Sequence, residues 1–283
     1  MPDGSAFPAD MRPIEICVTT PGDTDDLNAR MARNDARGLP EAIQTRSCII
    51  VGSGPSAADK RLWQWLRAHP DITRVAVNGA LSLFARNRVQ ADYWVCCDPQ
   101  DLVLDFVADE RLLKWANTYL VASKCPERLF DHLEGKDVRI WRLDDMAPSQ
   151  RPDVMHVSCA VSVTLVAQSL LRFMGYHRFG MYGWDACYIN GEHHASKQGE
   201  PENQTQFSIL SEGELIKDFG PDGFCYSYKE EEVLQVFDTC GSWVAELNDA
   251  CVQTHNLKAM GYEVVVHGPG AVGALLRAKG LIA

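Results

Sequence analysis

The stretch Ser47-Cys48-Ile49-Ile50-Val51-Gly52-Ser53-Gly54-Pro55-Ser56 decides the fold of this chain. An apolar run with β-branched residues, too short for a helix, ends at two glycines that flank a serine, and a proline then stands where a first helical turn begins. The pattern predicts a strand, a tight turn and the start of a helix. That order of elements is typical of the first crossover in a parallel α/β sheet.

The predicted turn has the features of an anion site. The first N–H groups of a helix have no internal partner and carry the positive end of the helix dipole, so they attract phosphate. Gly52 and Gly54 let the main chain approach a ligand closely, and Ser53 and Ser56 offer hydroxyls. A turn whose glycines meet only steric needs has the same sequence, so both interpretations stay open.

Composition bounds the class of protein. The 283 residues are 46% hydrophobic and 23% charged, which is enough for one large α/β domain with a core. The formal net charge of -11 disfavours a broad basic face for nucleic acid. Because no apolar stretch reaches membrane-spanning length and residues 1–25 carry no charged-then-apolar leader, we expect a soluble cytoplasmic protein without a membrane span.

The ten cysteines give no sign of a metal centre. None belongs to a Cys-x-x-Cys pair, and Cys96-Cys97 lies in an apolar run, as small buried hydrophobes do. Reduced cysteines are typical of cytoplasmic proteins. We therefore expect free thiols and no zinc site.

Strands and helices alternate through the middle of the chain. Apolar runs indicate strands at 73–78, 91–97, 119–123 and 138–141, and helices at 62–68, 79–84 and 127–133. This alternation predicts parallel crossovers. The expected fold is therefore α/β, with a Rossmann-like and mostly parallel sheet that helices cover on both faces.

Three segments set the expected domain organisation. Residues 1–45 contain five prolines and are expected to form an extended arm, and residues 46–283 to form a single domain. Residues 186–232 form a long connection, and connections of that length inside a compact domain tend to be lids or binding insertions. The candidate ligand contacts in this insertion are Lys197, Tyr226, Tyr228 and Lys229.

Polar side chains stand where predicted strands end, which is where ligands bind in open parallel sheets. Asn78 either contacts a ligand or caps the next helix. Asp98 either holds a metal or a ribose hydroxyl, or forms the turn before a proline. Ser158 or Ser162 stands at the entrance of a long buried helix, where it either caps the helix or binds phosphate.

Two histidines follow the strand that closes at Asp185. His193 and His194 either act as a base or form a solvated pair in the loop. The last predicted strand repeats the strand-then-glycine pattern, which makes His267 and Gly268 further candidates for ligand contact.

Several of these motifs, taken in order, resemble the MptE-like superfamily. The resemblance is carried by the Gly-Ser-Gly-Pro-Ser turn, Val77-Asn78, the segment from Tyr93 to Asp98, and Gly183-Trp184-Asp185-Ala186-Cys187-Tyr188 after a long helix. It covers about residues 46–195 and the closing strand. The group includes archaeal 6-hydroxymethylpterin diphosphokinase, flagellin-modifying motility accessory factors, and phage and bacterial proteins. It is also similar to bacterial sialyltransferases that use CMP-activated sugars.

The resemblance implies a nucleotide-dependent transferase, most simply a glycosyltransferase-like enzyme that takes a sugar from a CMP-type or UDP-type donor. It places the 52–56 turn at the nucleotide, Asn78 at its sugar or base, and Ser162 at the phosphate, with Asp185 and Tyr188 toward the acceptor. The candidates are Asp185, His193 and His194 for catalysis; Gly52, Ser53, Gly54, Pro55, Ser56, Asn78, Asp98, Ser158 and Ser162 for the nucleotide; and Tyr188, Tyr226 and Lys197 for the acceptor.

Two alternatives remain open. In the diphosphokinase branch, acidic clusters hold Mg²⁺ on a triphosphate, whereas the matching segments here read Cys96-Cys97-Asp98-Pro99 and Lys124-Cys125-Pro126, with a single carboxylate. In the sialyltransferases a His precedes the last helix, and this chain has Cys240-Gly241-Ser242-Trp243 there. The second alternative to the glycosyltransferase, besides the diphosphokinase, is a nucleotide-binding module without catalysis. The acceptor is not specified by the sequence, and a homo-oligomer is compatible with it.

Overall fold

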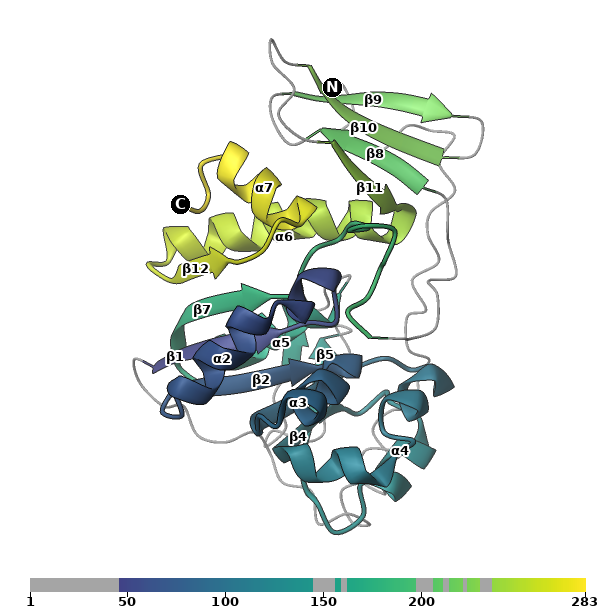
Figure 1. Cartoon of the computed structure of the whole chain (residues 1–283), viewed down its shortest axis with the longest axis vertical. Helices are drawn as coiled ribbons and strands as arrows, with labels where there is room; N and C mark the ends of the chain where they lie inside the picture. Colours follow the sequence, from purple (N-terminus) through teal and green to yellow (C-terminus); the bar gives the residue numbers. More distant parts are fainter. Residues whose placement is uncertain are drawn as a thin grey trace.

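The computed structural model describes residues 46–144, 156–158, 162–196, 206–210, 214–220, 223–229 and 236–283. Eight of its strands form one sheet in the order β12-β7-β1-β2-β3-β4-β5-β6, and each neighbouring pair is parallel (Figure 1). The predicted Rossmann-like α/β fold is therefore confirmed. The arm expected at residues 1–45 lies outside the described residues.

The elements follow one another in the predicted rhythm. The strands of the sheet are β1 (Arg46–Val51), β2 (Thr73–Val77), β3 (Ala91–Cys96), β4 (Ala116–Ala122), β5 (Asp137–Asp144), β6 (His156–Ser158), β7 (Tyr176–Tyr182) and β12 (Glu263–Val266). The helices are α2 (Lys60–Ala68), α3 (Leu81–Asn87), α4 (Glu127–His132), α5 (Val163–Phe173), α6 (Gly241–Ala259) and α7 (Ala271–Ala278). Short 3-10 turns are η1 (Pro55–Ala58), η2 (Asn78–Ala80), η3 (Asp101–Phe106) and η4 (Glu110–Trp115).

The strand order reverses beside β1. From β1 the chain moves through β2 to β6 toward one edge, and β7 then returns to the other side of β1. Because crossovers are right-handed, this reversal puts the later helices on the opposite face, and α2 and α3 lie in front of the sheet while α5 lies behind it (Figure 1). The ends of β1 and β7 therefore flank a topological switch point, where ligands bind in such sheets.

Helix α6 packs on the same side as α5. The Gln253 side-chain amide donates to the Leu165 carbonyl oxygen at 3.0 Å and to Gln168 Oε1 at 2.7 Å. Gln168 is fully buried, so these bonds satisfy polar groups inside the helical layer. They hold the second half of α6 against α5, and Glu246 in the first half of α6 lines the cavity at the strand ends.

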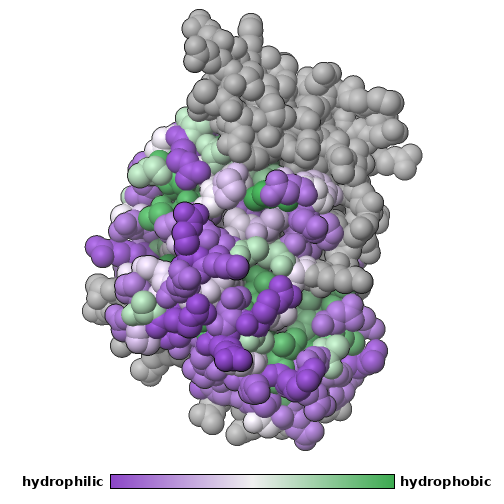
Figure 2. Space-filling view, viewed as in Figure 1, coloured by the Kyte–Doolittle hydropathy of each residue, from purple (hydrophilic) through white to green (hydrophobic). Residues whose placement is uncertain are grey.

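Aromatic side chains fill the core between the sheet and α2. Trp63 and Phe84 are almost fully buried and meet edge to face with ring centroids 5.1 Å apart. The Trp63 indole N–H donates to the Ala57 carbonyl oxygen at 2.8 Å, which fixes the turn after β1 against this core. Full burial of such a side chain contributes about 3 kcal/mol. Polar residues cover most of the coloured surface in Figure 2, and hydrophobic residues show between them in small patches.

The first helical turn, which the sequence predicted at Pro55, is a separate 3-10 turn and not the beginning of the α-helix. Pro55–Ala58 forms the 3-10 turn η1, and α2 begins only at Lys60. The Asp59 carboxylate caps α2 by accepting from the Arg61 main-chain N–H at 2.9 Å, and it also pairs with the Arg61 guanidinium. These hydrogen bonds hold the pKa of Asp59 below its usual range. The residues that directly follow Gly54 therefore belong to η1 and not to α2.

We expect Asp59→Ala to lower the free energy of unfolding by about 1 kcal/mol, because one main-chain donor at the start of α2 loses its acceptor. The matched variant Asp59→Asn keeps a capping oxygen and loses the ion pair, which is exposed and contributes little. Urea denaturation at neutral pH measures both. An equal loss in the two variants would show that the ion pair, and not the cap, holds the helix start.

The long connection contains strands that were not predicted. β8 (Gln206–Leu210) pairs antiparallel with β11 (Val236–Cys240), and β9 (Glu214–Gly220) pairs antiparallel with β10 (Gly223–Lys229). In Figure 1 these strands lie beyond the N-terminal end of α6. The high content of Gly, Gln and Asn had favoured a loop here. None of the helices among the described residues is long and apolar enough to cross a membrane.

Candidate functional site

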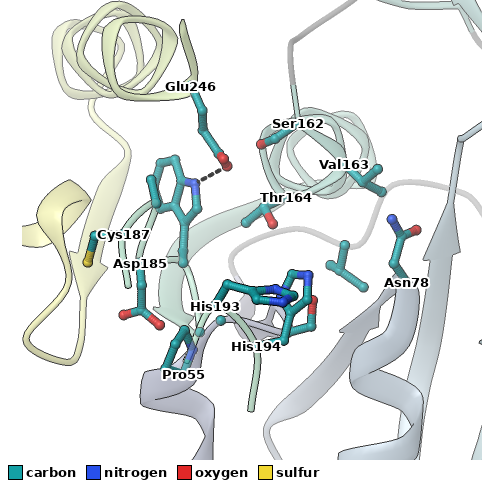
Figure 3. A pocket seen from close by; sticks show the side chains of 16 residues that line it. Pro55, Asn78, Ser162, Val163, Thr164, Asp185, Cys187, His193, His194 and Glu246 are labelled. Atoms are coloured by element: carbon teal, nitrogen blue, oxygen red, sulfur yellow. Dashed lines mark hydrogen bonds between the residues drawn. The ribbon is translucent and has the colours of Figure 1, made fainter. Parts of the chain in front are cut away.

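A cavity of about 180 Å³ lies at the ends of β1, β2 and β7, at the switch point of the sheet (Figure 3). Its wall consists of residues 53–55 after β1, Val77 and Asn78 at the end of β2, residues 162–164 at the start of α5, residues 183–187 after β7, His193 and His194 in the next loop, and Glu246 of α6. No lysine or arginine is among these described lining residues. The cavity brings together most of the residues that were predicted to form the site.

The two glycines after β1 allow the chain to pack against itself. The Gly52 N–H donates to the Tyr182 carbonyl oxygen at 2.8 Å, and the Gly54 N–H donates to the Gly183 carbonyl oxygen at 2.9 Å. A Cβ on Gly52 would lie 2.5 Å from the Gly183 oxygen. The steric interpretation accounts for both glycines. Their amides are used within the chain, and of the two only Gly54 lines the cavity.

Asp185 joins the end of β7 to the same turn. Its Oδ2 accepts from the Ser56 main-chain N–H at 2.8 Å, and the Gly183 N–H donates to Ser56 Oγ at 3.1 Å. Asp185 is 2% exposed, and burial raises the pKa of its carboxyl although the bonds from Ser56 oppose the change. In this arrangement Asp185 positions the main chain after β7. Ser56 contributes to the site through these two hydrogen bonds and does not line the cavity.

Ser162 is the N-cap of α5. Its hydroxyl oxygen accepts from the Leu165 N–H at 3.4 Å, so the capping interpretation is confirmed. Val163 and Thr164 follow it in the first turn and also line the cavity. The first N–H groups of a helix have no acceptor within the helix, so this end of α5 remains suited to a phosphate. Ser158 lies in β6, before the helix, and its side chain is not among those described.

Four polar side-chain atoms that belong to residues of the cavity wall are buried and make no hydrogen bond with any described residue: Asn78 Oδ1, Asp185 Oδ1, His193 Nδ1 and His194 Nδ1. Buried polar atoms are nearly always hydrogen-bonded, so four of them around one cavity indicate a polar ligand. Asn78 adopts φ 48°, and its carbonyl oxygen accepts from the Trp94 indole N–H at 2.8 Å. Asn78 is the first residue of the 3-10 turn η2, and its side chain does not cap that turn.

His194 is held in a defined orientation. The Ala195 N–H donates to the Ser53 carbonyl oxygen at 2.8 Å, and the His194 ring also hydrogen-bonds the Ser53 main chain. Because Nδ1 has no partner among the described residues, we assign this bond to Nε2–H, which leaves Nδ1 with a free electron pair. Burial and the neighbouring His193 lower the pKa of His194 to about 4. At neutral pH the cavity therefore faces a bare acceptor nitrogen.

The loop that carries the histidines turns tightly over the site. Ile189 and Glu192 form a β-bridge around Asn190 and Gly191, which adopt φ 55° and 79°. Such positive φ values suit a two-residue hairpin turn. Tyr188 precedes the bridge, and its ring stands edge-on to His193 with centroids 6.1 Å apart. Tyr188 therefore supports a histidine and is not part of the cavity wall.

Glu246 is the residue of the site that sequence reasoning missed. Its Oε1 accepts from the Trp184 indole N–H at 2.7 Å, and the Ser162 side chain also hydrogen-bonds it (Figure 3). Glu246 is 8% exposed, and burial raises the pKa of its carboxyl. No pattern marked it, because a glutamate within a helix ordinarily faces water.

The remaining candidates lie away from the cavity or outside the described side chains. The Asp98 carboxylate accepts from the Gln100 N–H at 2.9 Å, which is the turn interpretation. Lys197 falls outside the described residues, and the Tyr226 side chain in β10 is not described. Within the described part of the chain, no group of three His, Cys, Asp or Glu side chains is arranged to hold a metal ion. The cysteines described there are free thiols.

The comparisons with known proteins fit this geometry. No curated protein matches the chain. Seven chains of solved structures match, and one of them is the MAf glycosyltransferase from Magnetospirillum magneticum AMB-1, with a TM-score of 0.54 and 13% sequence identity. That similarity covers 93% of this chain and 42% of the other, so this chain spans less than half of that protein and shares its fold. A family model described as 6-hydroxymethylpterin diphosphokinase MptE-like matches residues 27–191, which is more than half of the sequence. This chain belongs to the MptE-like family.

Proposed function

We propose that this protein is a transferase that moves a sugar from a nucleotide-activated donor to an acceptor. The family and the glycosyltransferase among the similar structures both suggest a transferase. The observation that carries the proposal is the group of four buried polar atoms around one cavity at the switch point, none of which has a hydrogen-bond partner among the described residues. A preformed cavity with a few convergent polar groups at that place is typical of a nucleotide or substrate site.

The donor is a CMP-type or UDP-type nucleotide sugar, and its parts match different walls of the cavity. The first turn of α5 receives the phosphate, since no lysine or arginine is among the described lining residues and the helix dipole offers a positive end. Asn78 Oδ1 accepts from the sugar or the base. Ser53, Gly54 and Pro55 contribute shape and one hydroxyl, because the amides of Gly52, Gly54 and Ser56 are used within the chain.

His194 is the base in this proposal. Its Nδ1 takes the proton of the acceptor hydroxyl while the hydroxyl oxygen forms a bond to the anomeric carbon of the sugar. The bond from that carbon to the phosphate oxygen breaks, and its electron pair leaves with the nucleotide. An anionic phosphate beside the ring raises the pKa of His194 from its low value, which makes the nitrogen a better base when the donor is bound.

The diphosphokinase reaction is the second candidate, and the family description favours it. That reaction uses Mg²⁺ on a triphosphate, which one or two ionised carboxylates normally help to hold. Asp98 lies away from the cavity, and Asp185 and Glu246 are buried, hydrogen-bonded carboxyls whose pKa values are raised. The described residues therefore do not fit a Mg²⁺ ion, and we assign no step to one.

A thermal-shift experiment with CMP, UDP and ATP, each with and without Mg²⁺, tests the proposal. We expect CMP or UDP to raise the melting temperature to the same extent with and without Mg²⁺, corresponding to about 2.7 kcal/mol of stabilisation at a hundredfold excess over Kd. Mg²⁺-dependent stabilisation by ATP would support the diphosphokinase instead. Tight binding without turnover of any sugar donor would indicate a binding module, and no shift with any nucleotide would contradict all three.

A further inference from the structure

We propose that Glu246 is held as a neutral carboxylic acid and admits the anionic end of a ligand to the cavity only together with its proton. This inference rests on the proposed nucleotide site. Glu246, a residue of α6, thereby limits the binding of an anionic ligand to the protonated state of the site.

The position of Glu246 is the first support. The residue lies on α6, but its side chain reaches the cavity wall and is almost fully buried. One oxygen accepts from the Trp184 indole at 2.7 Å, and the Ser162 side chain also hydrogen-bonds the carboxyl. Glu246 therefore links the end of β7 to the first turn of α5, next to the amides that are suited to phosphate.

The charges around Glu246 are the second support. From the end of β7 it faces Asp185 and Cys187, from the following loop His193 and His194, and from its own helix Asp249. Helix α5 contributes only the hydroxyls of Ser162 and Thr164. No lysine or arginine lines the cavity among the described residues, so none of these residues would supply a lysine or arginine cation beside an ionised Glu246. Burial together with the charges of Asp249 and Asp185 raises the pKa of Glu246.

The consequence for binding follows from Coulomb's law. An ionised carboxylate beside the start of α5 repels a phosphate in a poorly solvated cavity, where charges interact more strongly than in water. A protonated carboxyl removes that repulsion and offers an O–H donor to a phosphate oxygen, as buried neutral carboxylic acids do in other sites. The complex with an anion thus contains one proton more than the unliganded, ionised site.

Calorimetric titration with CMP between pH 7 and 9.5 tests the inference, because the phosphate charge is constant in that range. We expect the affinity of the wild type to fall by up to about tenfold per pH unit above the pKa of Glu246. Glu246→Gln keeps a neutral side chain of the same shape, so its affinity should be independent of pH and should exceed that of the wild type at the upper end of the range. Neutral cytidine is the matched ligand, and its affinity should not change with pH.

Asp249→Asn is the matched protein variant. Removing this neighbouring charge lowers the pKa of Glu246, so the loss of CMP affinity should begin at a lower pH than in the wild type. A damaged fold would weaken binding at every pH and would not move this onset. A pH dependence that survives unchanged in Glu246→Gln overturns the inference.

The ligand-free protein supplies a readout that does not depend on the nucleotide site. A carboxyl whose folded pKa is raised binds its proton more tightly in the folded state, so the stability that it contributes falls as the pH rises from its usual range through the folded pKa. The melting temperature of Glu246→Gln minus that of the wild type should therefore increase between pH 5 and 9. A constant difference overturns the inference. If the difference increases but CMP binds at no pH, the proposed nucleotide site is wrong while the proton on Glu246 is supported.

Discussion

Replacing Gly54 by alanine is expected to lower the free energy of unfolding by about 2 to 4 kcal/mol. The new Cβ would lie 2.5 Å from Asp185 Oδ2 and 2.7 Å from the Gly183 carbonyl oxygen. Both atoms are fixed, one by the hydrogen bond from Ser56 and the other by its place after β7, so the strain cannot be relieved by a rotating side chain. Gly54 has φ −60° and ψ 160°, which alanine adopts freely, so the loss is purely steric.

Gly273→Ala is the matched control for this prediction. Its Cβ would meet the tip of the flexible Arg277 side chain at 3.0 Å, and alanine favours the helix in which it stands, so we expect no loss or a gain of up to about 1 kcal/mol. Urea denaturation followed by tryptophan fluorescence measures both variants. Wild-type stability in Gly54→Ala together with lost nucleotide binding would show that this glycine exists for the ligand and not for the packing of β1 against β7.

Replacing His194 by glutamine is expected to reduce sugar transfer by about 10² to 10⁴-fold, the usual contribution of a general base. The glutamine amide takes the place of Nε2 and keeps the hydrogen bond to Ser53, but no basic nitrogen then stands at the position of Nδ1. Donor affinity should change by only a few fold, so the loss should appear in kcat. His193→Gln is the matched control, and a larger loss in that variant would assign the base to His193.

The same variant should remove an acid sensitivity of the fold. Because the pKa of His194 is lowered from 6.5 to about 4, the unfolded chain takes up a proton in this range that the folded protein does not. The stability that His194 contributes is therefore fully present above pH 6.5 and is lost as the pH drops toward 4, by about 3 kcal/mol in all. His194→Gln should lose less stability over this range in urea titrations. An identical acid profile in the two proteins would contradict the assignment of this shift to His194.

Elements built from local patterns were predictable. The apolar run before Gly52, the alternation of strands and helices, and the cap at Ser162 each depend on residues close together in the chain, so their conformation follows from propensity and periodicity. The errors were also local. The delayed start of α2 reflects the cap at Asp59, and the strands between Gln206 and Cys240 were hidden by a composition that favours loops.

The sequence by itself determined the class of sheet, the alternation of strands and helices along the chain, and which polar residues follow the strand ends. What only the tertiary structure decided is which of these groups meet. The amide of Gly52 finds its acceptor in the last residue of β7 and that of Gly54 in the residue after it. Asp185 reaches Ser56 from 129 residues away, and Glu246 reaches Trp184 across 62 residues. Such partners are chosen by packing between elements distant in the chain, and a local pattern carries no information about them.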